Sequence, residues 1–457
     1  MSKTNSRLQK SDILTILDTA CACLLALCPF LQHYQGVMVD SRATVLLILV
    51  PYLLARMFQL NRVVWLPVLP LILFSLVKIV DKGTNVAELG REGMVCLVFL
   101  AAVSGAVDVK KVLTAMTVLA TVGCGLILVQ TVCYYLLDYH IQLIPTQMFL
   151  SSSDQWMGMA ETGKISILGN PMNMYRPSAI FMEPSHAAIY STPPLLMLLL
   201  SPGFNWRRCL AAVIITAGVV ASTSGLGIVL CMGLWFLYLA LYCGEGGENK
   251  PILFIKGFSI KEIHCKGIAI KGKRYGAFTI PGVTIRPINI VVVIALFVAA
   301  VLMYFFVDVF QNAINRILFS EDGYNAIDGR TSSGMLAVSK LVGSEWLTGK
   351  AVEGTEASWY MSGFFESMYK YGLIGTVISY VFYVNSLCKL KRQYCWFALL
   401  LLGLSYFTNH THGSAFMLLF CVLLLGGYRE QRADNLNHLS LRFRPFGFER
   451  RKETVNE

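Results

Sequence analysis

Charged residues are scarce in this chain: Asp, Glu, Lys and Arg make up 14% of its 457 residues, whereas 55% are hydrophobic. A soluble domain usually has about a quarter of its residues charged. Apolar runs of about 17 to 25 residues recur along nearly the whole length, which is typical of a protein that crosses a membrane many times. The composition therefore argues strongly against a large soluble helical protein.

Several motifs of known chemistry are also missing. The chain has no Walker phosphate loop and no zinc-ligand spacing, and Asp322-Gly323 and Asp328-Gly329 do not fit the calcium-loop pattern. None of the thirteen cysteines lies in the two long outer loops defined below, which excludes structural disulfides there. We therefore expect no metal and no cofactor. The first apolar run reaches no small-residue cleavage site, so we interpret it as the first span.

We predict an all-α polytopic membrane bundle of about twelve spans. They lie near 12–31, 43–60, 63–79, 92–107, 112–137, 184–201, 207–222, 224–242, 288–308, 364–387, 394–408 and 413–428. With the N-terminus inside, 27 of the 38 lysines and arginines fall on the inner side. This asymmetry follows the positive-inside rule and predicts that both termini are cytoplasmic. The net charge of +11 then suits anionic lipid head groups rather than nucleic acid.

The spans divide the chain into segments with distinct roles. We expect an N-terminal scaffold of five spans (1–137), a first long outer loop (138–183), central spans (184–242), a basic cytoplasmic loop (243–287), a span (288–308), a second long outer loop (309–363), C-terminal spans (364–428) and a basic cytoplasmic tail (429–457). The first outer loop has the composition of a lid against the membrane surface. The basic loop forms either a small hairpin or a surface tether.

Arg176 to His186 is the stretch with the densest chemistry, because it holds a guanidinium, a carboxylate and an imidazole immediately before an apolar run. A membrane helix that begins at Pro184 carries Glu183 and His186 at its mouth, where charged groups need partners or a function. Asp18, inside the first span, is expected to face a cavity or another helix.

The second outer loop contains two arginines, Arg316 and Arg330, in an outer region that is otherwise acidic. A guanidinium matches phosphate oxygens and stays charged, so the pair indicates anion recognition together with Arg176. The alternative is that each arginine pairs with a nearby acid, as Arg330 could with Asp328. Tyr360 follows in the same loop as a further substrate-contact candidate.

His410 and His412 lie in the last outer turn. Two histidines at this spacing do not share a helical face, so a metal pair is a weak interpretation. They are either hydrogen-bonding residues at the rim of a site or ordinary interface histidines.

Arg176 to Ser185 resembles the arginine-through-Glu-Pro-Ser signature of bacterial O-antigen and capsular polysaccharide polymerases. The order of Arg316, Arg330 and Gly349, then Gly354 and the later stretch Tyr371 to Gly375, is similar too, as is the Thr223-Ser224-Gly225 turn. The likeness covers roughly 170–380, and the O-antigen ligases share its plan.

The resemblance implies a membrane-embedded glycosyltransferase of the GT-C class (class B-like) in the bacterial cytoplasmic membrane. Its donor would be a growing glycan on undecaprenyl diphosphate, its acceptor one lipid-linked repeat unit, and a chain-length regulator a further partner. Fixed arginines, Arg176, Arg316 and Arg330, would hold the diphosphate charge. Glu183 or His186 would serve as the base, unless Glu183 instead orients Arg176.

Two other hypotheses compete with the polymerase. A ligase would move finished glycan to another acceptor, which the sequence does not reveal. A flippase or other transporter for lipid-linked oligosaccharide should place charges at mid-membrane and show internal repeats. Here the charges cluster in the outer loops and the halves show no repeat, which favours the enzyme.

Overall fold

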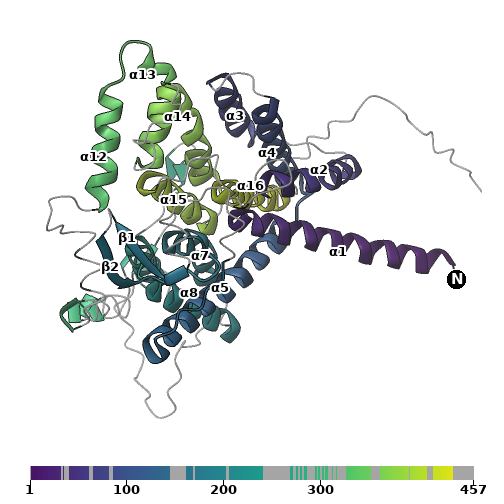
Figure 1. The fold of residues 1–457 in the computed structure, drawn as a ribbon. Coiled ribbons are helices and arrows are strands. Elements are labelled where there is room, and N and C mark those ends of the chain that lie inside the picture. The colour runs from purple at the N-terminus through teal and green to yellow at the C-terminus, as the bar shows by residue number, and fades with distance from the viewer. Residues whose placement is uncertain are drawn as a thin grey trace, which may run out of the picture.

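The computed structural model describes a helical protein with three pairs of short strands (Figure 1). It describes residues 2–31, 34, 41–60, 65–81, 86–144, 161–167, 170–201, 205–239, 326–350, 361–390, 392–408 and 415–435, with short pieces between 268 and 315. The helices are α1 (Ser2–Leu31), α2 (Ser41–Leu60), α3 (Leu69–Asp81), α4 (Val86–Ser104), α5 (Val109–Leu137), α7 (Pro184–Leu200), α8 (Trp206–Ala221), α9 (Gly225–Leu237), α12 (Ala326–Ser339), α13 (Glu345–Thr348), α14 (Gly363–Lys389), α15 (Arg392–Phe407) and α16 (Ala415–Asn435). The strands are β1 (Lys164–Ile167), β2 (Asn170–Tyr175), β3 (Ile268–Ile270), β4 (Arg274–Tyr275), β5 (Phe278–Thr279) and β6 (Val283–Ile285).

A described helix covers each predicted span except 288–308, of which only short pieces are described. By length and composition, four helical stretches could cross a membrane: Asp12–Leu31, Ser41–Leu60, Val109–Leu137 and Gly363–Lys389. Leu69–Ile79, Gly225–Leu237 and Gln393–Tyr406 are shorter apolar helices. The chain is therefore a helical membrane protein, whereas the number of twelve spans stays a prediction.

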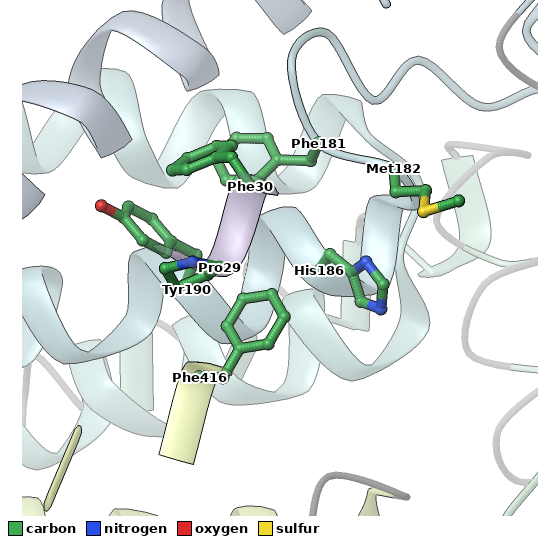
Figure 2. A pocket seen from close by; sticks show the side chains of 7 residues that line it. All are labelled: Pro29, Phe30, Phe181, Met182, His186, Tyr190 and Phe416. Atoms are coloured by element: carbon green, nitrogen blue, oxygen red, sulfur yellow. The ribbon is translucent and has the colours of Figure 1, made fainter. Parts of the chain in front are cut away.

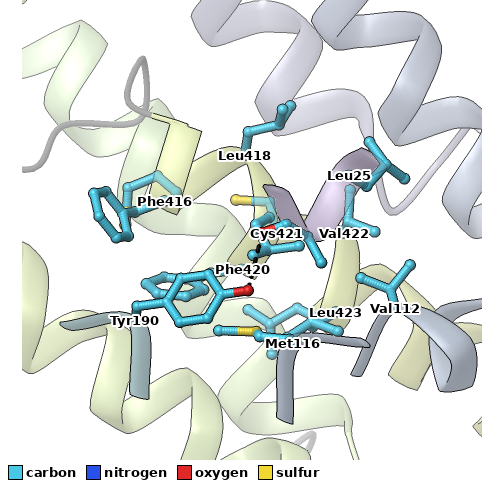
Figure 3. Packing of buried hydrophobic residues seen from close by; sticks show 14 of the residues in the cluster. Leu25, Val112, Met116, Tyr190, Phe416, Leu418, Phe420, Cys421, Val422 and Leu423 are labelled. Atoms are coloured by element: carbon cyan, nitrogen blue, oxygen red, sulfur yellow. Dashed lines mark hydrogen bonds between the residues drawn. The ribbon is translucent and has the colours of Figure 1, made fainter. Parts of the chain in front are cut away.

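Helix α7 lies at the centre of the bundle. Nearly all of its side chains are buried, and it packs against α5, α8, α9, α15 and α16. Its Tyr190 lies in one apolar cluster with Met116 of α5 and Phe420 of α16 (Figure 3). The Tyr190 hydroxyl donates to the carbonyl of Ala26 in α1 over 2.9 Å, so this buried polar group is satisfied. An apolar helix buried on every side is a rigid base for the residues at its N-terminus.

Small residues allow the central helices to approach closely. A Cβ atom at Gly218 of α8 would lie 2.4 Å from that of Cys124 in α5, and one at Gly227 of α9 would lie 2.8 Å from that of Ala188 in α7. Such contacts are the usual way in which membrane helices gain packing energy. The result is that α9 lies against the first two turns of α7.

The loops contain strands, which refines the expectation of an all-α chain. In the first outer loop, β1 and β2 form an antiparallel hairpin rather than only a lid. In the basic loop, β3 pairs with β6 and β4 pairs with β5, both antiparallel. Short antiparallel strand pairs therefore occur within 268–285, whereas residues 243–267 lie outside the described residues and the role of the loop stays a prediction.

Helix α14 is two helices joined at Gly372, whose φ of 61° and ψ of −168° are not helical. The rings of Phe364 and Tyr380 lie 5.7 Å apart. In a straight helix these residues would be separated by about 24 Å, so the first segment folds back against the second. The predicted span 364–387 thus falls within one stretch that could cross a membrane by length and composition, but this stretch is broken at Gly372 rather than straight.

Asp18 faces another helix, as one of the two sequence-based alternatives proposed. It accepts a hydrogen bond from Tyr52 and pairs with Arg56 at 3.4 Å, both in α2. A charge within the bundle is thus neutralised by its neighbour.

Candidate functional site

The stretch Arg176 to His186 joins the β1–β2 hairpin to α7. Arg176 directly follows β2, and its backbone N–H donates to the carbonyl of Gly163 over 2.7 Å. A turn follows, in which Phe181 N–H donates to Ser178 over 2.8 Å. Pro184 then opens α7, as its fixed φ and missing N–H predict. The half-buried Arg176 is therefore held between a hairpin and a buried helix.

Tyr175 fixes the end of β2 against α5. Its ring stacks on that of Tyr134 with centroids 3.8 Å apart, and its hydroxyl lies 2.8 Å from Nδ1 of His140. Burial raises the pKa of the Tyr175 phenol to about 12, so it stays protonated at physiological pH. The residue before Arg176 is thus an anchor that the sequence analysis did not identify.

Glu183 and His186 lie three residues apart and share one face of the first turn of α7. Glu183 is the N-cap residue, and its Oε2 accepts a hydrogen bond from the Ser185 hydroxyl over 2.8 Å. A carboxylate at this position interacts favourably with the positive end of the helix dipole. His186 is buried, with 9% of its surface exposed. The sequence-based placement of both groups at the mouth of α7 is confirmed.

His186 lines a small pocket with Pro29, Phe30, Phe181, Met182, Tyr190 and Phe416 (Figure 2). The ring of His186 lies 5.3 Å from that of Phe416, the second residue of α16. The cavity between these side chains has a volume of about 10 Å³, which is roughly the space for one water molecule and far below the range of about 300 to 1,000 Å³ usual for small-molecule sites. The pocket is therefore too small to bind a sugar.

The predicted outer ends of several helices meet near this junction. The N–H of Gly363, which opens α14, donates to the carbonyl of Thr408 at the end of α15 over 2.5 Å. The segment that contains His410 and His412 leaves α15 at Thr408 and joins α16 at Ala415, beside Phe416. The described C-terminal ends of both long outer loops thus lie at the same end of the bundle as the mouth of α7.

The remaining site candidates are placed only in part. Arg316, Tyr360, His410 and His412 lie outside the described residues. Arg330 lies in α12, whose Gly334 packs against Phe365 of α14, but its side chain is outside the description. The structure therefore brings Arg176, Glu183 and His186 into one junction and leaves the assembly of the others as a prediction.

A buried ion pair between α3 and α4 was not predicted from the sequence. Nζ of Lys78 lies 2.5 Å from Oε1 of Glu92, with 9% and 5% of the two side chains exposed. Lys78 also lies over the ring of Phe74, which packs edge-on against Tyr371 beside the break in α14. Lys78 and Glu92 lie at the ends of predicted spans, where a charged side chain is more often exposed to solvent. Only the tertiary structure shows that they pair.

Within the described part of the chain, no group of three His, Cys, Asp or Glu side chains is arranged to hold a metal ion. No protein-family model, curated protein or solved structure matches the chain.

Proposed function

We propose that this protein is a membrane glycosyltransferase that joins oligosaccharide repeat units carried on undecaprenyl diphosphate, on the outer side of the bacterial cytoplasmic membrane. The product would be an O-antigen, capsule or exopolysaccharide chain. The observation that carries the proposal is the junction at α7, where Arg176, Glu183 and His186 follow one another between a hairpin and a buried helix. An anion-binding group and two proton acceptors are the groups that such a transfer needs.

The reaction requires the glycosidic bond between the donor sugar and its diphosphate to break. The diphosphate leaves with the bonding electron pair, and a guanidinium held beside it stabilises the charge that develops. Arg176 suits this role because its backbone is fixed by Gly163 and by the anchored Tyr175. The N-terminus of α7 contributes a positive dipole end near the same place.

The acceptor is a hydroxyl of a lipid-linked repeat unit, which attacks the anomeric carbon of the donor and gives up its proton. Two assignments of the base fit the junction. Either Glu183 takes the proton, or Glu183 orients Arg176 and His186 takes it. Glu183→Gln separates them: it retains hydrogen bonding to an arginine but removes the proton acceptor, so it abolishes transfer only under the first assignment.

The ligase remains the second candidate, because a different acceptor would need the same donor chemistry. Transport is less well supported. The described charges inside the bundle, Lys78 with Glu92 and Arg56 with Asp18, are paired with each other, so a structural role accounts for them.

A complementation series tests the proposal. The gene is deleted in its host and restored as wild type, Arg176→Ala, Arg176→Lys or Arg207→Ala, and the surface glycan is separated on a gel. Arg207 is the matched control, because this exposed arginine stands at the start of α8 over the ring of Trp206.

We expect single repeat units in the deletion strain and in Arg176→Ala, with a loss of about 10²- to 10³-fold in polymer. Arg176→Lys should restore little polymer, since lysine lacks the planar fork of hydrogen-bond donors. Arg207→Ala should make as much polymer as the wild type. Full-length glycan retained on the lipid carrier would instead establish a ligase. Repeat units trapped on the cytoplasmic face would replace the enzyme with a transporter.

A further inference from the structure

We propose that Gln130 of α5 is a positioning residue that closes the first outer loop and thereby holds the backbone between Arg176 and Glu183. Its effect on activity rests on the proposed function, whereas its effect on the loop does not. Gln130 is a polar residue in an apolar helix and is 2% exposed. A buried amide in such a helix needs hydrogen-bond partners.

Both partners of the side chain come from the outer loop, one from each end. Nε2 of Gln130 donates to the carbonyl of Ile141 over 2.6 Å, at the start of the loop. Oε1 accepts from the N–H of Ala179 over 2.9 Å, near its end. The backbone carbonyl of Gln130 also accepts from the hydroxyl of Tyr175 at 3.4 Å.

The orientation of the amide follows from these partners. A carbonyl can only accept and a backbone N–H can only donate, so a flipped amide would oppose two acceptors and two donors. Neither asparagine, which is shorter, nor glutamate, which lacks the donor when ionised, can join the same two groups. Glutamine is therefore specifically suited to this position.

The partner at the end of the loop is a strained residue. Ala179 has a φ of 50°, a left-handed conformation that alanine rarely adopts. It lies three residues after Arg176 and four before Glu183, within the turn that Phe181 closes on Ser178. Such a conformation persists only where its surroundings hold it. The hydrogen bond from Ala179 to Gln130 supplies that restraint, and through it Gln130 acts on Arg176 and Glu183 without contacting substrate.

The proposal can be tested in the purified full-length protein by peptide-resolved hydrogen exchange and in the complemented host by polymer yield. Gln130→Leu removes both side-chain hydrogen bonds while keeping an apolar helix. Gln142→Leu is the matched control, because the hydrogen bond of Gln142 among the described residues is a local one, to Ile144 in the same loop. We expect peptides that cover 175–183 to exchange about tenfold faster or more in Gln130→Leu, with a comparable loss of polymer, and no change in Gln142→Leu.

Rescue by Ala179→Gly distinguishes positioning from a general loss of stability. Glycine adopts a positive φ without strain, so the turn no longer depends on Gln130. The double variant Gln130→Leu/Ala179→Gly should regain most of the protection over 175–183 and most of the polymer. A general packing defect at Gln130 would not be repaired by a change in the turn.

Two results would overturn the proposal. Unchanged exchange over 175–183 in Gln130→Leu would show that the loop does not depend on this residue. Restored protection without restored polymer would show that Gln130 acts on the substrate directly. If protection falls and returns as expected but the wild type makes no polymer in any assay, the positioning role stands and the proposed function fails.

Discussion

Charged side chains inside the bundle are paired with residues of neighbouring helices. Lys78 and Glu92 join α3 to α4, and Asp18 joins α1 to Arg56 and Tyr52 of α2. Removal of one partner of a buried pair leaves an uncompensated charge, which costs far more than the pair contributes. We therefore expect a substitution of one partner to lower the stability of the protein strongly. Replacement of both partners of a pair should lower it only weakly.

Glu92→Met should lower the free energy of unfolding by about 3 to 5 kcal/mol, because it leaves the Lys78 ammonium buried without its carboxylate. The double variant Lys78→Met/Glu92→Met should recover most of that loss, since both charges are replaced by apolar groups. Thermal unfolding in detergent measures both. If the losses from the two single substitutions simply add in the double variant, the pair has no such role.

The raised pKa of Tyr175 predicts that the stability of the protein depends on pH at alkaline values. Its pKa is raised to about 12, mainly by burial, whereas an unfolded tyrosine ionises near its ordinary value of about 10. The folded state thus binds the proton more tightly, so stability is unaffected below pH 10 and falls as the pH rises from about 10 to 12. The fall in melting temperature over this window should be smaller in Tyr175→Phe than in the wild type. An equal fall in both would show that Tyr175 is not the titrating group.

Candidate site residues could be identified from the sequence where several functional groups lie close together along the chain. Arg176, Glu183 and His186 could be identified because eleven residues contain all three. Gln130 and Tyr175 could not be identified, because each has a partner far away in the sequence. His140 lies 35 residues before Tyr175, and Ala179 lies 49 residues after Gln130. A polar residue inside an apolar span was the signal that could have led to Gln130.

Among the elements, the break in α14 matters most for the outer side of the bundle. A Cβ atom at Gly372 would lie 2.4 Å from the backbone of Leu347, and one at Gly349 would lie 2.3 Å from the carbonyl oxygen of Lys370. Both glycines have a positive φ, so two backbones meet where no side chain fits. Gly349 and Gly372 thus allow the backbone of α13 to pack directly against α14 at its break.

Gly372→Ala should destabilise the protein by more than about 2 kcal/mol, from strain at positive φ and from the clash with Leu347. Gly403→Ala is the control: it lies in α15, a Cβ atom there meets nothing within 4 Å, and alanine is the better helix former. Melting temperatures of the two variants give the comparison. Equal stability of Gly372→Ala and wild type would mean that α14 is not folded back at this residue.

Helix positions could be predicted from apolar runs, because burial in lipid or in the bundle needs the same long apolar segments. The fold-back of α14 could not, since glycines such as Gly372 are frequent inside membrane helices, and only its backbone conformation and the contact between Phe364 and Tyr380 reveal the break. The β1–β2 hairpin was missed for a related reason. The four residues of β1 alternate polar and apolar side chains, but so short a run is a weak signal, and β2 contains a proline and no strict alternation.

For the whole molecule, we expect the mouth of α7 to face the outer side of the membrane. The described C-terminal ends of both long outer loops lie at one end of the bundle, and the charge asymmetry predicts that this end is outside. Alkaline phosphatase fused after residue 340 should therefore be active, and a fluorescent protein fused to the C-terminus should be fluorescent. The reverse pattern would place the junction in the cytoplasm and exclude the outer-side reaction.

Reconstitution tests the proposed function most directly. Purified protein is incorporated into liposomes with lipid-linked repeat units extracted from the deletion strain, and the lipid-linked glycans are then separated by size. We predict a ladder of chains several repeat units long with the wild type, and single units only with Arg176→Ala of equal thermal stability. If the wild type leaves the units single while moving them across the bilayer, the protein is a transporter and the proposal is wrong.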